Sequence, residues 1–395
     1  MTTSRRDFLT FSQNNAIASS DNADILIYIF QRGAADGMNL VVPYGDDDYY
    51  INRPTVNIPK PNSGEGSGID LDGFFALNPS LAALLPIYQA QDLAMIHAFG
   101  ANDSTHSHFK NQAYVDRGAL DTTFADGWLA RYVNSTSGND SAFKSVAMSA
   151  SIPPSLAGAE AVVALNTIEG FQIVAPESES EALQLSLSSL YSGDSSLDLT
   201  AQATFSAVDL IADINPEDYP VEYGAQYPNS GFANKLKDLA VLIKSGIGIE
   251  TASVDIGGWD THNSQADDLN QLAQDYADSV AAFYTDMKDY MANISMITLT
   301  EFGRRAAENG SAGTDHGTAS VSFVMGGGVN GGQVYRDWPG LSPADLVGPG
   351  DLAITTDYRT VIAELLDKRL NFQDIETVFP DFEVPEYLGI FTPKS

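Results

Sequence analysis

Five short apolar runs, each followed at once by a glycine-rich or polar loop, constrain the fold of this chain more than any other feature. The runs are Ile25–Phe30, Leu93–Ala98, Ala252–Ile256, Met296–Leu299 and Val321–Met325. Runs of this length are typical of strands buried on both faces. Segments with helical periodicity separate them, and this alternation predicts an α/β fold with a largely parallel sheet covered on both faces.

Helical periodicity is clearest in three segments. Pro79–Ala90 follows Asn78, a good N-cap, and Pro86 is expected to kink or shorten the helix. Ser264–Met291 is long and has apolar side chains on one face, and Asp357–Leu366 is expected to form another helix.

The length of 395 residues fits one large domain, with or without an inserted cap. We expect an export-signal-like segment at 1–23 and a single domain at 24–395. Residues 142–227 are rich in Ser, Ala, Glu and Asp, with a helix expected at Glu177–Leu190. We expect a cap or insertion over the site there; a peripheral helical layer of the same domain is the alternative.

Charge and cysteine content exclude several classes of function. The formal net charge is -32 and no basic stripe occurs, which argues against nucleic-acid binding. The chain has no cysteine, which excludes disulfides, thiolate metal sites and cysteine nucleophiles. No apolar run reaches the roughly 18 residues of a membrane span. The oligomeric state cannot be derived from these features.

The beginning of the chain is similar to a twin-arginine export signal. It reads Ser4-Arg5-Arg6-Asp7-Phe8-Leu9, but the next nine residues are more polar than the apolar region of such a signal. The arginine pair, the absence of cysteine and the acidic composition together predict a periplasmic or extracellular protein.

All five histidines fall at or near the ends of predicted strands: His97, His106, His108, His262 and His316. Ligands in open α/β sheets lie at the carboxyl ends of strands. We therefore expect one shared site built from the loops 32–37, 100–108, 257–262, 301–304 and 326–328, together with 314–317 before the last run.

Carboxylates accompany these histidines and suggest a metal site. The predicted ligands are Asp36, Asp260, His262, Glu301, Asp315 and His316. Carboxylate and imidazole donors suit Zn, Mn or Fe better than Ca, and we expect a divalent ion such as Zn, Mn or Mg. The alternatives are turn chemistry at Asp36, a helix cap at Asp260, a Glu301–Arg304 pair, and an orienting role for Asp315.

A serine beside a histidine opens the helix expected at Phe109–Asp116. A hydroxyl at a helix N-terminus gains from the helix dipole and from free N–H groups. Ser107 is the candidate nucleophile, Thr105 is the second choice, and a simple N-cap is the alternative. Arg304 offers a planar fork for a phosphate or sulfate oxyanion. The predicted catalytic residues are Ser107, His108 and Arg304.

Several motifs occur in an order that resembles the bacterial domain-of-unknown-function family 1501. Besides the arginine pair they are Arg32–Asn39, Ser107–Phe109, Gly258–His262, Glu301–Arg304 and Thr314–Gly317, and the resemblance covers about Ile25 to Leu388. This family is sulfatase-like and is assigned to the alkaline phosphatase superfamily. The resemblance implies a three-layer α/β/α fold of the alkaline phosphatase/sulfatase type.

Hydrolytic members of that superfamily hold two divalent metals beside a nucleophile. The resemblance implies that Ser107 or Thr105 is the nucleophile and that the metal ligands include Asp36, Asp260, His262 and His316. Where the superfamily has an Asp-His pair this chain has Glu301-Phe302, so one imidazole of the second metal site is missing.

The sequence therefore predicts a metal-dependent hydrolase of phosphate or sulfate esters, acting on a small anionic ester or glycan. One alternative is a non-catalytic secreted or surface binding protein that keeps the fold, which the missing imidazole favours. Another is a metal-free hydrolase that uses Ser107, His108 and Asp103.

Overall fold

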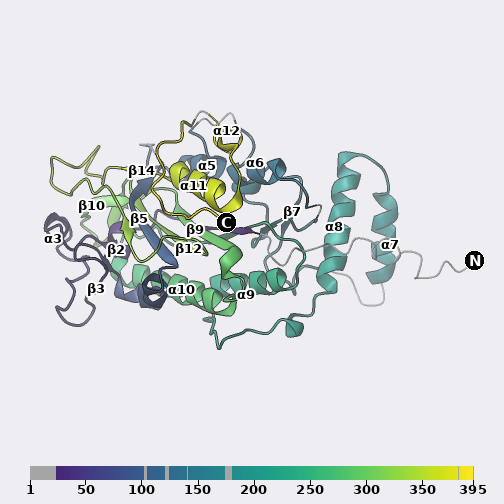
Figure 1. Cartoon of the computed structure of the whole chain (residues 1–395), viewed down its shortest axis with the longest axis horizontal. Helices are drawn as coiled ribbons and strands as arrows, with labels where there is room; N and C mark the ends of the chain where they lie inside the picture. The colour runs from purple at the N-terminus through teal and green to yellow at the C-terminus, as the bar shows by residue number, and fades with distance from the viewer. Residues whose placement is uncertain are drawn as a thin grey trace, which may run out of the picture.

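A mostly parallel sheet of nine strands forms the centre of the part of the chain that the structure describes (Figure 1). The computed structural model describes residues 24–101, 105–120, 124–139, 141–173, 180–380 and 382–394. The arginine pair at positions 5 and 6 and Asp103 lie outside the described residues. In spatial order the strands are β13 (Val334–Tyr335), β5 (Leu93–Gly100), β12 (Ser320–Gly326), β9 (Ile294–Thr300), β1 (Ile25–Gln31), β8 (Thr251–Ile256), β6 (Ser145–Ala147) and β7 (Val162–Ala164), with β14 (Thr356–Asp357) paired to β5. All five predicted strands are confirmed.

The direction of β12 corrects one prediction. This strand is antiparallel to both of its neighbours, β5 and β9, whereas the other pairs of the sheet are parallel. Its beginning therefore lies at the edge where β1, β5, β8 and β9 end. The prediction that the loop 326–328 belongs to the shared site is wrong, because this loop leaves the opposite edge. The segment before β12 takes its place.

Helices cover both faces of the sheet, as the apolar runs predict (Figure 1). In β1, the odd-numbered residues 25–29 pack in one core cluster and the even-numbered residues 26–30 in another. Successive residues of a strand point to opposite faces, so a continuous apolar run is buried on both. The first cluster includes α9 (Gly231–Lys244) and α10 (Gln265–Asp286); the second includes α5 (His108–Arg117), α6 (Trp128–Ser135) and α11 (Tyr358–Leu370). The three-layer α/β/α class with a central, mostly parallel sheet is confirmed.

The three predicted helices are present with shifted ends. The first divides into a 3-10 helix, η1 (Pro79–Leu84), and α4 (Leu85–Gln89), with Pro86 in the first turn of α4. The second corresponds to α10, followed by the 3-10 turn η4 (Met291–Asn293), and the third to α11. The remaining elements are α2 (Gly37–Leu40), β2 (Val41–Val42), α3 (Asp48–Asn52), β3 (Ile69–Asp70), β4 (Ala76–Leu77), η2 (Pro154–Leu156), η3 (Pro216–Asp218), β10 (Arg304–Glu308), β11 (Thr314–His316) and α12 (Ile375–Val378).

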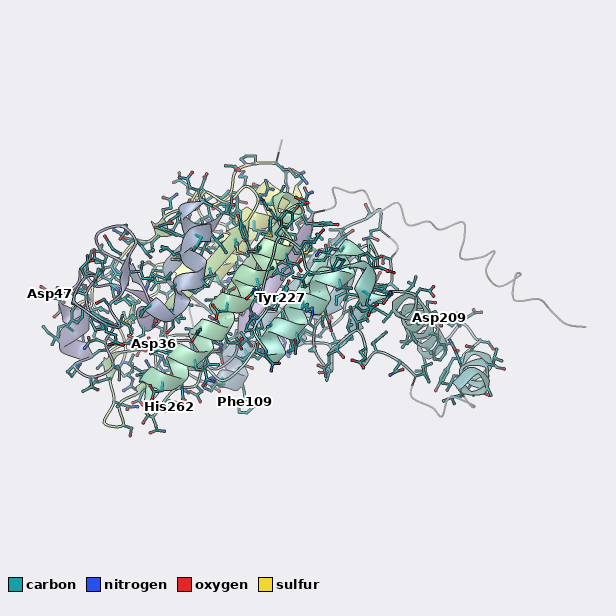
Figure 2. All side chains as sticks on the ribbon, turned by 90° about the horizontal axis from the view of Figure 1, so that it is seen from below. Asp36, Asp47, Phe109, Asp209, Tyr227 and His262 are labelled. Carbon is teal, nitrogen blue, oxygen red and sulfur yellow. The ribbon has the colours of Figure 1, made fainter. Side chains whose placement is uncertain are left out.

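Residues 142–227, predicted as a cap or insertion, contain two strands of the central sheet and a helical hairpin. Strands β6 and β7 belong to the central sheet. The helices α7 (Ser180–Leu190) and α8 (Ser196–Ala212) lie beside the β7 edge and extend away from the sheet (Figure 1). Figure 2 shows Asp209 of α8 in a part of the molecule well separated from His262. The first part of this segment is thus sheet, and the hairpin extends away from the edge that carries the histidines.

Among the described helices, none combines the length and the apolar character that a membrane crossing requires.

Candidate metal centre

Loops at one edge of the sheet bring three histidines and an aspartate together. Asp260 and His262 follow β8, His108 begins α5, and His316 ends β11 just before β12. The Nε2 atom of His316 lies 3.1 Å from that of His108 and 2.9 Å from that of His262. Asp260 Oδ1 lies 2.9 Å from His262 Nε2 and 3.1 Å from His316 Nε2, and its Oδ2 lies 3.3 Å from His108 Nε2. We call these four residues the histidine cluster.

The other nitrogen of each imidazole faces an acceptor. His108 Nδ1 donates to Glu301 Oε1 over 2.8 Å, and His316 Nδ1 donates to the carbonyl oxygen of His106 over 2.9 Å. His262 Nδ1 lies 3.6 Å from Asp315 Oδ1. A neutral imidazole carries one proton, so an acceptor at Nδ1 leaves the Nε2 lone pair directed at the cluster. This is the tautomer that a metal ligand requires.

The charges around the cluster favour ligation by Asp260 and His316 but act in the opposite direction on His108. Burial alone would raise the pKa of Asp260, but hydrogen bonds from Arg304 and His316 outweigh it and lower the pKa to about 2. Burial lowers the pKa of His316 and so favours the neutral ring. The hydrogen bond to Glu301 raises the pKa of His108. The structure thus presents an ionised carboxylate beside His316, whose burial favours its neutral form.

Glu301, predicted as a metal ligand, lies behind His108 and supports it. Its carboxylate is fully buried and accepts from His108 Nδ1, Gly33 N (2.9 Å), Gln112 Nε2 (2.8 Å) and Thr300 Oγ1 (3.1 Å). Burial would raise the pKa of Glu301, but the hydrogen bonds from His108 and Gln112 outweigh it and lower the pKa. Carboxylates in this position orient metal-binding histidines and raise their basicity.

Two glycines allow the loops to approach so closely. Gly33 has a φ of +122°, and a Cβ on it would lie 2.6 Å from the backbone nitrogen of Asp260. A Cβ on Gly303 would lie 1.8 Å from the carbonyl oxygen of Ala319. Both positions therefore require glycine. The close approach at Gly33 lets its N–H reach Glu301.

Arg304, predicted to contact an oxyanion, is buried and donates to the loops of the site. It orients Asp260 through a 2.7 Å contact from Nη2 to Oδ1. Its other acceptors are the carbonyl oxygens of Ala34, Thr314, Gly33 and Trp259, at 2.6–2.9 Å. Its guanidinium therefore holds Asp260 and the backbone of three loops in place, those at 33–34, 259–260 and 314.

Asp36, also predicted as a ligand, is half of a buried ion pair. Its side chain has no exposed surface, and its Oδ2 accepts from Arg53 Nη1 and from Gln265 Nε2, both over 2.6 Å. Arg53 also donates to Asn39 Oδ1 over 2.7 Å and to the carbonyl of Ala306 over 3.0 Å. A guanidinium thus supplies the cation for this carboxylate.

The predicted nucleophiles stand at the start of α5. Ser107 is the N-cap residue of this helix and is partly exposed, and its hydroxyl makes no capping hydrogen bond in the described structure. Thr105 Oγ1 accepts from Asn111 Nδ2 over 3.0 Å. Ser107 directly precedes His108 in the chain, so the candidate nucleophile is next to a residue of the histidine cluster.

The remaining two histidines lie apart from the cluster. His97 is buried in the core, where its Nε2 contacts the carbonyl of Val41 at 2.9 Å and burial lowers its pKa to about 4. His106 adopts a φ of +50°, and its Nε2 lies 2.7 Å from Asp351 Oδ2. His106 contributes to the site through its backbone carbonyl, which accepts a hydrogen bond from His316 Nδ1 and orients that ring.

Two site residues were missed by sequence reasoning. The Phe302 ring is buried, and its centroid lies 5.0 Å from those of both His108 and His316, so it forms an apolar wall. Gln112 reaches Glu301 from α5, and its spacing of four residues from His108 was the available signal.

Comparison with known proteins supports the resemblance seen in the sequence. A family model described as "Protein of unknown function (DUF1501)" matches residues 104–378. A comparison with curated proteins found no match.

Three solved structures show a weak likeness. The C-terminal periplasmic domain of EcEptC from Escherichia coli in complex with Zn is 11% identical, with 78% of this chain and 74% of that chain covered and a TM-score of 0.35. The alkaline phosphatase from the Antarctic bacterium TAB5 is 10% identical, with coverages of 80% and 95% and a TM-score of 0.33. The lipoteichoic acid synthase LtaP from Listeria monocytogenes is 10% identical, with coverages of 87% and 77% and a TM-score of 0.31. The chemistry of the site therefore has to be argued from its own residues.

Proposed function

The chain belongs to the DUF1501 family, and we propose that it is a metal-dependent hydrolase of phosphate or sulfate esters with its metal ion in the histidine cluster. The observation that carries the proposal is the convergence of three Nε2 atoms on Asp260 while each Nδ1 faces an acceptor. Three imidazoles and one carboxylate in this arrangement have the chemistry of a metal site.

The spacing of the donor atoms fits this proposal. A tetrahedral Zn ion, bound at about 2.0–2.1 Å, places neighbouring ligand atoms about 3.3 Å apart. The contacts of His108, Asp260 and His316 with one another span 3.1–3.3 Å. His262 lies outside this group of three, whose ligand atoms all lie within 4.8 Å of one another, and it joins the cluster through His316 and Asp260, at 2.9 Å each. We propose His108, Asp260, His262 and His316 as ligands. This donor set favours Zn, with Mn and Mg as the alternatives.

The residues around the cluster have distinct roles in this proposal. When bound, the metal ion supplies a Lewis acid that polarises the ester. Ser107 is the nucleophile, and the N-terminus of the ten-residue helix α5 favours negative charge at its hydroxyl. Glu301 and Asp315 hold two of the imidazoles from behind, and Arg304 holds Asp260.

We further propose a small anionic ester or glycan as substrate and a periplasmic or extracellular location. The substrate follows from the chemistry that a metal ion and a hydroxyl nucleophile perform together. The location rests on the sequence alone, namely Arg5-Arg6, the acidic composition and the absence of cysteine.

The deciding experiment measures metal and turnover together. Elemental analysis of the purified protein is combined with aryl phosphate and aryl sulfate assays in the presence of Zn, Mn, Mg or Ca. We expect about one metal ion per chain, bound by the protein with a coordination position left open for the ester oxygen. Ser107→Ala should keep the metal and lose turnover, whereas Thr105→Val should retain both. A protein without metal and without esterase activity would refute the hydrolase proposal.

A metal-binding protein without turnover is the second candidate. One observation that favours it is that each of the three guanidinium nitrogens of Arg304 already donates to the protein. The other is that Phe302 stands where the superfamily has a histidine, and its ring lies against His316. Bound metal with no cleavage of either ester would decide for this candidate.

A further inference from the structure

We propose that Gln112, held by Arg32, is a positioning residue that keeps the His108 ring directed at the metal. The inference rests on the proposed function, since it concerns one ligand of that metal. Gln112 and Arg32 contact neither Asp260 nor His316 through any hydrogen bond found among the described residues. They act instead through the buried carboxylate of Glu301.

Gln112 and His108 meet the same carboxylate oxygen. They lie four residues apart on α5, which places their side chains on one face of the helix. His108 Nδ1 and Gln112 Nε2 both donate to Glu301 Oε1 over 2.8 Å. Gly33 N donates to both oxygens of the same carboxylate. The direction of the Glu301 carboxylate, and with it that of the His108 ring, is therefore set in part by Gln112.

Arg32 fixes which way the Gln112 amide points. Its Nη1 donates to Gln112 Oε1 over 3.2 Å. A guanidinium has only donors and an ionised carboxylate only acceptors, so the amide must turn its oxygen to Arg32 and its NH₂ to Glu301. Arg32 is itself fixed by Asp255, through contacts of 2.7 and 3.3 Å, and by Asp116 at 3.3 Å.

A glutamine is required for this link because it accepts at one end and donates at the other. A glutamate there would still accept from Arg32 but could not donate to Glu301. A leucine of similar size could do neither. The two substitutions therefore separate the contact with Glu301 from the contact with Arg32.

The test compares Gln112→Leu and Gln112→Glu with the wild type and with Lys110→Ala, an exposed change on the same helix. Zn dissociation constants are measured by competition with a chelator, and the stability of each metal-free protein by urea unfolding. Because outer partners of metal ligands typically change affinity 10- to 100-fold, we expect both Gln112 variants to bind Zn about 10-fold more weakly and the control to match the wild type.

A second readout does not need the metal. The His108 Nδ1 proton, held against Glu301, should give a slowly exchanging NMR signal in the metal-free wild type and in Lys110→Ala, and that signal should be lost in both Gln112 variants.

The two readouts separate the failure of this inference from that of the proposed function. If the wild type binds no metal, the proposed function fails, and the NMR signal alone decides the inference. If Gln112→Leu keeps the signal and the wild-type Zn affinity, the positioning role is refuted. The positioning role is also refuted if Gln112→Leu unfolds at a lower urea concentration than the wild type but binds Zn with the wild-type affinity.

Discussion

Asp36 and Asp260 follow neighbouring strands of the same sheet, yet their surroundings are opposite. Asp36, in the loop after β1, is fully buried against the guanidinium of Arg53, 2.6 Å away. Asp260, in the loop after β8, also pairs with a guanidinium, that of Arg304 at 2.7 Å, but its side chain is 46% exposed and faces three imidazoles. An aspartate at a strand end is thus a ligand candidate only where its carboxylate stays partly exposed and faces other donor atoms, even when an arginine also holds it.

The two regions also differ in what completes them. The Asp36 pair has its cation within the chain and is a structural unit of the fold. In the histidine cluster, Nε2 lone pairs and a carboxylate lie about 3 Å apart, and such groups repel unless a proton or a metal ion lies between them. The first region should therefore respond to mutation through stability and the second through metal affinity.

The largest effect expected from this contrast is that of Arg53→Leu. It leaves the Asp36 carboxylate buried and unpaired, which typically costs about 3–5 kcal/mol of the free energy of unfolding. Zn affinity of the folded fraction should stay at the wild-type value. Urea unfolding with a Zn titration measures both. The control is Lys60→Ala, which breaks the exposed pair with Asp47 and should change little. A loss of Zn binding in folded Arg53→Leu would contradict the contrast.

His316→Ala should give the converse result. It removes a central member of the histidine cluster, and because outer partners alone change affinity 10- to 100-fold, Zn should bind more than about 100-fold more weakly. The metal-free protein should unfold at nearly the wild-type urea concentration, because the ring is partly exposed. Elemental analysis and chelator competition are the measurements. Unchanged Zn affinity would exclude His316 as a ligand.

Asp116 offers a third case, a buried carboxylate whose arginine is shared. Burial raises its pKa from 3.8 to about 6, although Arg32 acts in the opposite direction. A raised pKa means that the folded state favours the protonated form. The stabilising contribution of this group is therefore complete below about pH 4 and is lost as the pH rises through about 6.

Asp116→Asn cannot titrate, so its stability relative to the wild type should improve by on the order of 2–3 kcal/mol between pH 4 and pH 7. Urea unfolding of both proteins across that range is the measurement. If the difference in unfolding free energy between the two proteins does not change from pH 4 to pH 7, Arg32 neutralises Asp116 as fully as Arg53 neutralises Asp36.

The sequence predicts the strands of this fold well but not all of their directions. The apolar run Val321–Met325 is as clear as that of β1, and both are strands. The composition of an apolar run does not indicate in which direction the strand crosses the sheet, so nothing in it shows that β12 is antiparallel. That direction follows from the β10–β11 hairpin, which returns the chain to the site edge before β12 begins.

For the site, the sequence predicts which residues come near the edge but not what each side chain meets. Asp260, His262 and His316 were predicted as metal ligands and His108 as a catalytic residue, and the structure brings the four together. The partner of Asp36 could not be found in this way, because Arg53 reaches it only through the tertiary fold.

Gln265 connects the two regions. Its substitution is expected to have the smallest of the predicted effects, and that effect tests directly whether the two regions are independent. Its Nε2 donates to Asp36 Oδ2 over 2.6 Å, and its Oε1 accepts from Thr261 Oγ1 and Thr314 Oγ1 over 3.1 and 2.5 Å. Thr261 stands between Asp260 and His262 in the chain, and Thr314 precedes His316 by two residues. The buried ion pair is thus tied to both loops of the cluster.

Gln265→Leu should lower the free energy of unfolding by about 1–3 kcal/mol, because it leaves buried polar partners unpaired. Its Zn affinity should fall only a few-fold, since the ligand loops keep their other contacts with Arg304 and Glu301. Gln271→Leu, an exposed change on the same helix, is the matched control and should alter neither quantity. If Gln265→Leu instead lost Zn as fully as His316→Ala, the ion pair and the cluster would be one cooperative unit. The contrast between Asp36 and Asp260 would then describe two ends of a single network.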